Sequence, residues 1–126
     1  MNHLQRDIQR CPRVAVYGTL KRGYRNHYWL EGAALLGQDR LSTITLYDLG
    51  PYPGAKKEAS HGAVIEVYAI TPEQLALLDQ LEDYIAHAPH TGVYDRAIFP
   101  TQHGQAWCYL YNADVEGAVR IDSGEW

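Results

Sequence analysis

The chain has 126 residues, of which 46% are hydrophobic and 21% charged, a balance typical of a compact domain and unlike that of a disordered or fibrous chain. Its 11 Lys and Arg residues against 15 Asp and Glu residues give a net charge of −4, which disfavours nucleic acid as a partner because polyanion binding needs clustered positive charge. No run approaches the roughly 18 apolar residues of a membrane-spanning helix, and the first residues lack the apolar stretch of a signal peptide. We therefore expect a single cytoplasmic domain, residues 1–126, that does not act at a membrane.

The first half of the chain alternates β-favouring runs with turn residues. Residues 1–12 are polar and are expected to be frayed. The Gly18–Gly23 turn follows the first predicted strand, and a short helix can follow over Asn26–Leu30. Gly50–Gly54 is a rigid loop, because its prolines cannot donate to a sheet ladder. The strands predicted here cover residues 13–17, 34–38 and 41–49.

The second half contains one clear helix between strands. Thr71, Pro72 and Gln74 form a capping-box pattern with proline at the first helical position, so the helix should run from Pro72 to about Asp83. Residues 85–91 form a loop. Strands are predicted over 61–70, 92–100 and 104–111. Many strands with one strong and one weak helix indicate an α+β fold, with a mainly antiparallel or mixed sheet that can curl into a barrel.

Helical geometry places one carboxylate of this helix on its apolar face. At about 100° per residue, Glu82 falls between Leu78 and Leu75 on the helical wheel, inside the apolar arc. Burial and the negative end of the helix dipole both raise the pKa of a carboxyl group, which suits a general base that later acts as an acid. The alternative is that the helix frays before Glu82 and releases its side chain into water.

The Gly18–Gly23 turn has glycine at both ends, as a phosphate-binding loop does. Tyr24 and Arg25, however, stand where that motif needs Lys and Ser or Thr, so a nucleotide site is not predicted. A buried strand that ends in a turn can still present backbone N–H groups to a carboxylate or a developing oxyanion. The alternative is an ordinary turn between a strand and a helix.

The sequence offers no metal centre and no acyl-enzyme nucleophile. Only His87 and His90 lie close together among the six histidines, and they lack the helical spacing of a zinc site. Cys11 and Cys108 match no metal-ligand spacing and are expected to be free thiols. No serine lies in a nucleophile-elbow motif.

Taken together, four segments in order resemble the γ-glutamylcyclotransferase family. The resemblance is to its short bacterial members and to the γ-glutamylamine cyclotransferases, including the type used in aminoglycoside biosynthesis. The closing Gly117–Trp126 segment also looks like the bacterial short form. The four segments are Val14–Gly23, Leu49–Gly54, Leu78–Tyr84 and Tyr94–Arg96.

The resemblance implies a small barrel of mixed strands with flanking helices around a cavity. It also implies a transferase reaction in which the free α-amine of a γ-glutamyl compound attacks its own γ-carbonyl, yielding 5-oxoproline and an amine or amino acid. In the family the glutamate of the Leu-Asp-x-x-Glu segment is the acid and base, here Glu82. Because the attack is intramolecular, no cofactor is implied. The residues expected to bind the substrate are Tyr17, Gly18, Thr19, Leu20 and Tyr94.

Other residues are weaker candidates for the cavity wall. Tyr52, Tyr84, Tyr111 and Arg96 could line it, although packing is the more common role for such residues. The stretch Ile85–Thr91 lacks the family's usual glycine after the glutamate. It is expected to border the leaving group, together with Lys21 and Arg22 on the neighbouring turn and the carboxylates Asp83 and Asp95.

Two other classes of function stay open at this point. A binding module could hold a γ-glutamyl or similar carboxylate ligand without turnover, but it would gain nothing from an unpaired carboxylate on the apolar face of the helix. A structural protein could use exposed tyrosines to bind partners, for which the sequence carries no positive signal. The residues do not define an oligomeric state.

Overall fold

The computed structural model describes residues 2–126, and Met1 lies outside the described part of the chain. The helical elements are α1 His3–Arg10, η1 His27–Leu30, α2 Pro72–Leu81 and η2 Pro89–Thr91, where η marks a 3-10 helix. The strands are β1 Arg13–Val16, β2 Ala34–Leu41, β3 Thr45–Asp48, β4 Pro53–Lys56, β5 Ala63–Ala69, β6 Tyr94–Thr101, β7 Gly104–Tyr111 and β8 Val119–Arg120. The fold is therefore α+β, as predicted.

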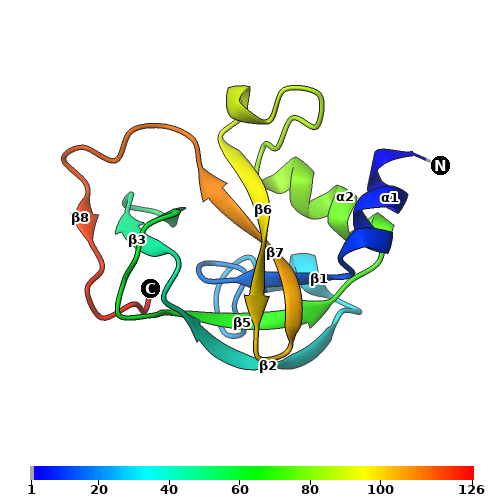
Figure 1. Ribbon diagram of the computed structural model, residues 1–126, viewed down its shortest axis with the longest axis horizontal. Coiled ribbons are helices and arrows are strands. Elements are labelled where there is room, and N and C mark those ends of the chain that lie inside the picture. The colour runs from blue at the N-terminus through cyan, green and yellow to red at the C-terminus, as the bar shows by residue number, and fades with distance from the viewer. Residues whose placement is uncertain (1) are drawn as a thin grey trace.

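The strands form two sheets (Figure 1). The larger has the order β2-β5-β1-β7-β6, and it is mixed because β1 pairs antiparallel with β5 and parallel with β7. The smaller has the order β4-β3-β8. Pro53 opens β4 at the edge of this sheet, where a missing N–H does no harm, so a strand begins inside the predicted Gly50–Gly54 loop.

The described strands do not close into the barrel that the family resemblance implies, because β2 and β6 are edge strands without a shared ladder. The turn between β6 and β7 reaches β2 through side chains instead. Gln102 donates through its backbone N–H to Asp39 Oδ2 at 3.0 Å and through Nε2 to the Gln38 carbonyl at 2.9 Å. His103 packs directly over Gly37, at a bulge in β2 that interrupts the regular register.

The N-terminal segment forms the helix α1, so the expectation of a frayed end is wrong for residues 3–10. Asn2 and Gln5 cap the helix reciprocally. Asp7 forms an ion pair with Arg96 of β6 at 2.9 Å, and the Trp107 indole N–H donates to the Cys11 carbonyl at 3.0 Å. The two residues of each contact are about ninety or more positions apart in the sequence, so the local composition around α1 does not predict them.

Helix α2 begins as predicted. The Thr71 hydroxyl caps the helix by accepting from the Gln74 N–H at 3.2 Å, and Pro72 is the first helical residue. It ends at Leu81, two residues earlier than expected. Glu82 is the C-cap residue, and Asp83 has a left-handed backbone with φ of 52°, which stops the helix. Figure 1 shows α2 beside α1, and the two helices contact one another.

The core has two parts, which contain alternate residues of the same strands. Val14 and Val16 of β1 pack with Leu75 and Leu78 of α2. The residue between them, Ala15, packs in the other part, which includes residues of β3 and β4. The large sheet thus has a helical layer on one face and the small sheet against the other.

Candidate active site

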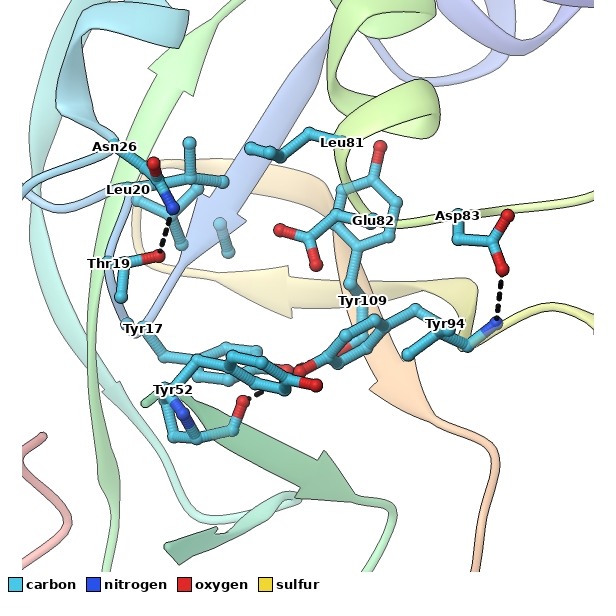
Figure 2. Close-up of a pocket in the computed structure, with 15 residues that line it drawn as sticks. Tyr17, Thr19, Leu20, Asn26, Tyr52, Leu81, Glu82, Asp83, Tyr94 and Tyr109 are labelled. Carbon is cyan, nitrogen blue, oxygen red and sulfur yellow. Dashed lines mark hydrogen bonds between the residues drawn. The ribbon is translucent and has the colours of Figure 1, made fainter. Parts of the chain in front are cut away.

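A pocket of about 310 Å³ opens where the end of β1, the end of α2 and the starts of β4 and β6 meet. All six residues predicted to act at a site line it: Tyr17, Gly18, Thr19, Leu20, Glu82 and Tyr94. Figure 2 shows Glu82 and Tyr94 on the opposite side of the pocket from Thr19 and Leu20. The structure therefore brings the predicted acid and base into one pocket with the Gly18–Gly23 turn.

Glu82 lies at the end of α2, where its backbone N–H donates to the Leu78 carbonyl at 2.9 Å. The helix does end before Glu82, yet the side chain stays partly buried and lines the pocket. Its carboxylate points toward the side of the pocket formed by Thr19 and Leu20 (Figure 2). Within residues 2–126 it has no hydrogen-bond donor or cation as a partner, and burial raises the pKa of this carboxyl group to about 7.

Four carbonyl groups of the Gly18–Gly23 turn are already hydrogen-bonded. Those of residues 18–21 accept, in order, from Lys21 N–H at 3.1 Å, Asn26 N–H at 3.0 Å, His27 Nδ1 at 2.9 Å and Tyr24 N–H at 3.1 Å. Because a carbonyl oxygen only accepts, His27 Nδ1 carries the proton in this contact. The peptide units are therefore held with their acceptors already occupied.

The backbone N–H groups of Gly18, Thr19 and Leu20 find no acceptor within residues 2–126. All three residues line the pocket that Glu82 enters. A Cβ atom on Gly18 would lie 2.7 Å from Pro53 Cγ, so the close approach of β4 requires glycine at this position. Unpaired backbone N–H groups are able to donate to a carboxylate or an oxyanion.

The tyrosine hydroxyls of Tyr17 and Tyr94 are bonded to the wall of the pocket. Tyr17 donates to the Tyr109 carbonyl at 2.8 Å and accepts from Ala55 N–H at 3.2 Å. Tyr94 donates to the Pro53 carbonyl at 2.8 Å. Burial raises the pKa of both phenols, so they stay neutral and offer aromatic surface.

The weaker candidates divide. Tyr52 lines the pocket, whereas Tyr84, Tyr111 and Arg96 do not. Arg96 is buried between the rings of Tyr84 and Trp107, at 4.2 and 4.5 Å from their centroids. Tyr111 packs edge-on against Tyr94 behind the wall.

Asp79 is a residue that the sequence reasoning missed. It is buried in α2, where it binds Arg96 Nε at 2.8 Å and accepts from the Tyr109 hydroxyl at 2.6 Å. Tyr109 lines the pocket, so Asp79 ties the helix of Glu82 to the pocket wall. The available signal was the position of Asp79 at the edge of the apolar arc, one turn before Glu82.

The prediction of which residues border the leaving group is wrong for all of them except Asp83. None of residues 85–91 lines the pocket, and neither do Lys21, Arg22 and Asp95. Val93 N–H bonds to the Asp83 carbonyl at 3.1 Å, which separates residues 84–92 from the pocket. Lys21 turns toward the Trp126 carbonyl, at 3.5 Å. Tyr52, Asp83 and Val93 form the exposed part of the lining instead.

Residues 2–126 contain no group of three or more His, Cys, Asp or Glu side chains placed to hold a metal ion. None of the helices in this range is long and apolar enough to cross a membrane.

A family model described as gamma-glutamyl cyclotransferase, AIG2-like, matches residues 14–126. The chain belongs to this family. Helix α1 precedes the matched range, whereas the pocket lies wholly within it.

Relatives of known sequence span most of the chain. The gamma-glutamylcyclotransferase family protein YtfP of Escherichia coli K12 is 39% identical over 116 residues, covering 90% of this chain and 95% of the relative. The gamma-L-glutamyl-butirosin B gamma-glutamyl cyclotransferase of Niallia circulans is 32% identical over 108 residues, covering 82% of this chain and 69% of the relative.

Solved structures share the fold. An uncharacterized protein from Pyrococcus horikoshii superposes with a TM-score of 0.73 at 31% identity, over 90% of this chain and 87% of that one. An AIG2-like protein from mouse superposes with a TM-score of 0.70 at 25% identity, over 83% of this chain and 80% of that one.

Proposed function

We propose that this protein releases 5-oxoproline and an amine or amino acid from a γ-glutamyl substrate, with Glu82 as general base and then general acid. The observation that carries the proposal is the carboxylate of Glu82, partly buried and unpaired, in the same pocket as the unpaired N–H groups of Gly18–Leu20. A carboxyl group with this raised pKa fits proton transfer near neutral pH, since it can both accept a proton and give it back.

The reaction begins with the α-ammonium group of the substrate, which cannot attack until it loses a proton. Ionised Glu82 accepts that proton, and the amine nitrogen then forms a bond to the γ-carbonyl carbon. The carbonyl oxygen becomes an oxyanion. Protonated Glu82 gives its proton to the leaving nitrogen, and the bond between that nitrogen and the γ-carbon breaks as the carbonyl reforms. The ring nitrogen still carries one proton too many, which the ionised Glu82 takes and passes to the released amine, leaving 5-oxoproline, an ammonium product and ionised Glu82. A carboxyl group with a pKa of about 7 exists in both of the required states near neutral pH.

The protein has two tasks besides proton transfer. It must fold the substrate so that its own amine reaches its own carbonyl, and the aromatic walls of Tyr17 and Tyr94 restrict that pose. It must also stabilise the oxyanion, and the unpaired N–H groups of Gly18–Leu20, in residues that line the pocket, support that role for them. Neither task calls for a cofactor.

The test is the release of 5-oxoproline from a panel of γ-glutamyl amines, γ-glutamyl dipeptides and glutathione. We expect turnover of at least one member of the panel. Calorimetric titration of the same panel separates the two classes of function, because a non-catalytic module would bind a member and release no 5-oxoproline. That result would overturn the proposal.

A further inference from the structure

Glu66 is a buried carboxylate that the proposed reaction does not use. It lies on β5 with 5% of its surface exposed, in a strand whose neighbours on both sides are β1 and β2. Among residues 2–126 it forms no ion pair with a Lys, Arg or His side chain. Burying a carboxylate without an ion-pair partner costs free energy, so its hydrogen bonds have to offset that cost.

Those hydrogen bonds lead to the Gly18–Gly23 turn. Glu66 Oε1 accepts from the backbone N–H of Arg22 at 2.8 Å and from the hydroxyl of Tyr68 at 2.9 Å. The side chain of Arg22 is exposed, so the backbone of the turn makes this contact. Tyr68, two residues further along β5, serves as a second neutral donor.

The same residue also stands opposite the start of the turn. In the antiparallel pairing of β1 and β5, Glu66 is the partner of Val16, the last residue of β1. The chain leaves the sheet after Val16, passes through the pocket-lining residues 17–20, and returns to Glu66 at Arg22. Glu66 therefore lies opposite the residue after which the segment leaves the sheet, and its carboxylate bonds to the N–H of Arg22 after the segment.

We propose that Glu66 is a positioning residue that fixes the N–H groups of Gly18–Leu20 in the pocket by closing the turn on β5. The inference rests on the proposed function, in which those groups bind the oxyanion or a carboxylate of the substrate. Glu66 does not line the pocket and acts only through the turn. Displacement of a positioned group by about 1 Å can lower a rate by about 10²-fold.

The experiment compares two substitutions of similar size. Glu66→Gln keeps an oxygen acceptor for Arg22 and should keep kcat/KM near that of the wild type. Glu66→Met removes the acceptor, and kcat/KM should fall by roughly ten- to a hundredfold. The pH dependence of kcat/KM, which reports the pKa of Glu82, should be the same in Glu66→Gln and Glu66→Met, because Glu66 does not contact the carboxyl group of Glu82.

Two matched controls isolate the backbone contact. Arg22→Ala removes the exposed side chain but keeps the N–H, and Tyr68→Phe removes the second hydrogen bond of Glu66 but keeps the first. Both should retain wild-type kcat/KM. A folded Glu66→Met protein with wild-type kcat/KM, or a Tyr68→Phe protein that loses as much activity as Glu66→Met, would overturn the proposal.

Amide hydrogen exchange tests the same inference without activity. The N–H of Arg22 should be protected in the wild type and in Glu66→Gln, and exposed in Glu66→Met. If Glu66→Met does not fold, an unprotected Arg22 amide in the wild type alone refutes the positioning role. A wild type that releases no 5-oxoproline from any substrate refutes the proposed function, while the exchange of Arg22 still decides the role of Glu66.

Discussion

Glu82 is the residue on which the proposed reaction depends, and an isosteric amide tests it directly. Glu82→Gln keeps the shape of the side chain but cannot exchange a proton. Since general acid and base groups contribute about 10²–10⁴-fold, kcat should fall by that factor in a protein that folds normally. Glu73→Gln, which removes an exposed carboxylate from the first turn of the same helix, should leave kcat unchanged. Near-full turnover by folded Glu82→Gln would exclude this mechanism.

The pH dependence of the reaction follows from the pKa of about 7 that burial gives Glu82. The base must be ionised in the free enzyme, so kcat/KM should decrease about tenfold per pH unit below that pKa. Steady-state rates between pH 5 and pH 9 measure this decrease of kcat/KM at low pH. A flat profile from pH 5 to pH 7 would contradict the assignment of the base.

The same shift links stability to pH. The pKa of Glu82 rises from an ordinary 4.5 to about 7 in the folded chain, so between these values the folded state binds more protons than the unfolded state. The contribution of Glu82 to stability therefore falls as pH rises through that window. Denaturant unfolding of the wild type and Glu82→Gln should show the wild type losing stability relative to the variant between pH 4.5 and pH 7. A difference that does not change with pH would show that the carboxyl group is solvated in the folded protein.

Helix α2, which Glu82 caps, is joined to the large sheet by an ion pair between Asp79 and Arg96. Arg96 on β6 is fully buried and binds Asp79 of α2 through two nitrogens, while Asp7 of α1 binds it with a side chain that is 25% exposed. Asp79 also accepts from Tyr109 in the pocket wall. The arrangement fixes α2 against β6 and β7, and the N-terminal helix adds to it from outside the family match.

Removing one member of a buried pair leaves a buried charge without its partner. Asp79→Asn should therefore lower the free energy of unfolding by about 3–5 kcal/mol. Asp7→Asn changes a more exposed partner of the same guanidinium and should cost clearly less, about 1 kcal/mol. Urea unfolding at neutral pH measures both. Equal losses in the two variants would mean that Asp79 is not the principal partner of Arg96.

Elements with strong local signals were predictable, and those held by distant partners were not. The cap at Thr71 and the apolar residues of α2 are all within about a dozen residues of one another in the sequence. They predict both the helix and the inward direction of the Glu82 side chain. By contrast, Asp79 depends on a partner 17 residues away, and α1 depends on Arg96 and Trp107, 89 or more residues away. Strand β8 has only two residues, too few for a pattern of alternation. The open sheet was not predictable either. Its edge strands β2 and β6 are joined by hydrogen bonds of Gln102, in the turn between β6 and β7, with Gln38 and Asp39, and composition does not predict such contacts.

The pocket forms where the helical layer and the small sheet, on the two faces of the large sheet, meet. Helix α2 brings Glu82 and Asp83 from one face, and the segment that begins β4 brings Tyr52 and Pro53 from the small sheet. The turn after β1 lies between them. The chemistry of the pocket therefore depends on both sheets, because the hydroxyl of Tyr17 bonds to Ala55 of β4 in the small sheet and to Tyr109 of β7 in the large one.

The charge of this pocket leads to a prediction about the leaving group. Its lining includes the carboxylates of Glu82 and Asp83 and, among residues 2–126, no Lys, Arg or His, in a chain whose net charge is −4. In the proposed reaction, the N–H groups of Gly18–Leu20 stabilise an anion at the glutamyl end and leave the leaving group without a donor. A leaving group with its own carboxylate, as in glutathione, would face these carboxylates without a counter-charge. We expect a γ-glutamyl amine to have the higher kcat/KM, by differential contacts of ~1–3 kcal/mol.

Comparison of kcat/KM across γ-glutamyl amines, a small γ-glutamyl amino acid and glutathione measures this preference. The small γ-glutamyl amino acid should fall between the amine and glutathione, because it carries one carboxylate but less bulk. Asp83→Asn removes the exposed carboxylate at the pocket and should narrow the gap between the amine and glutathione, since less repulsion then acts on the leaving group. A clear preference of the wild type for glutathione would refute this account of specificity and leave the cyclisation mechanism intact, because Glu82 acts on the glutamyl end that all these substrates share.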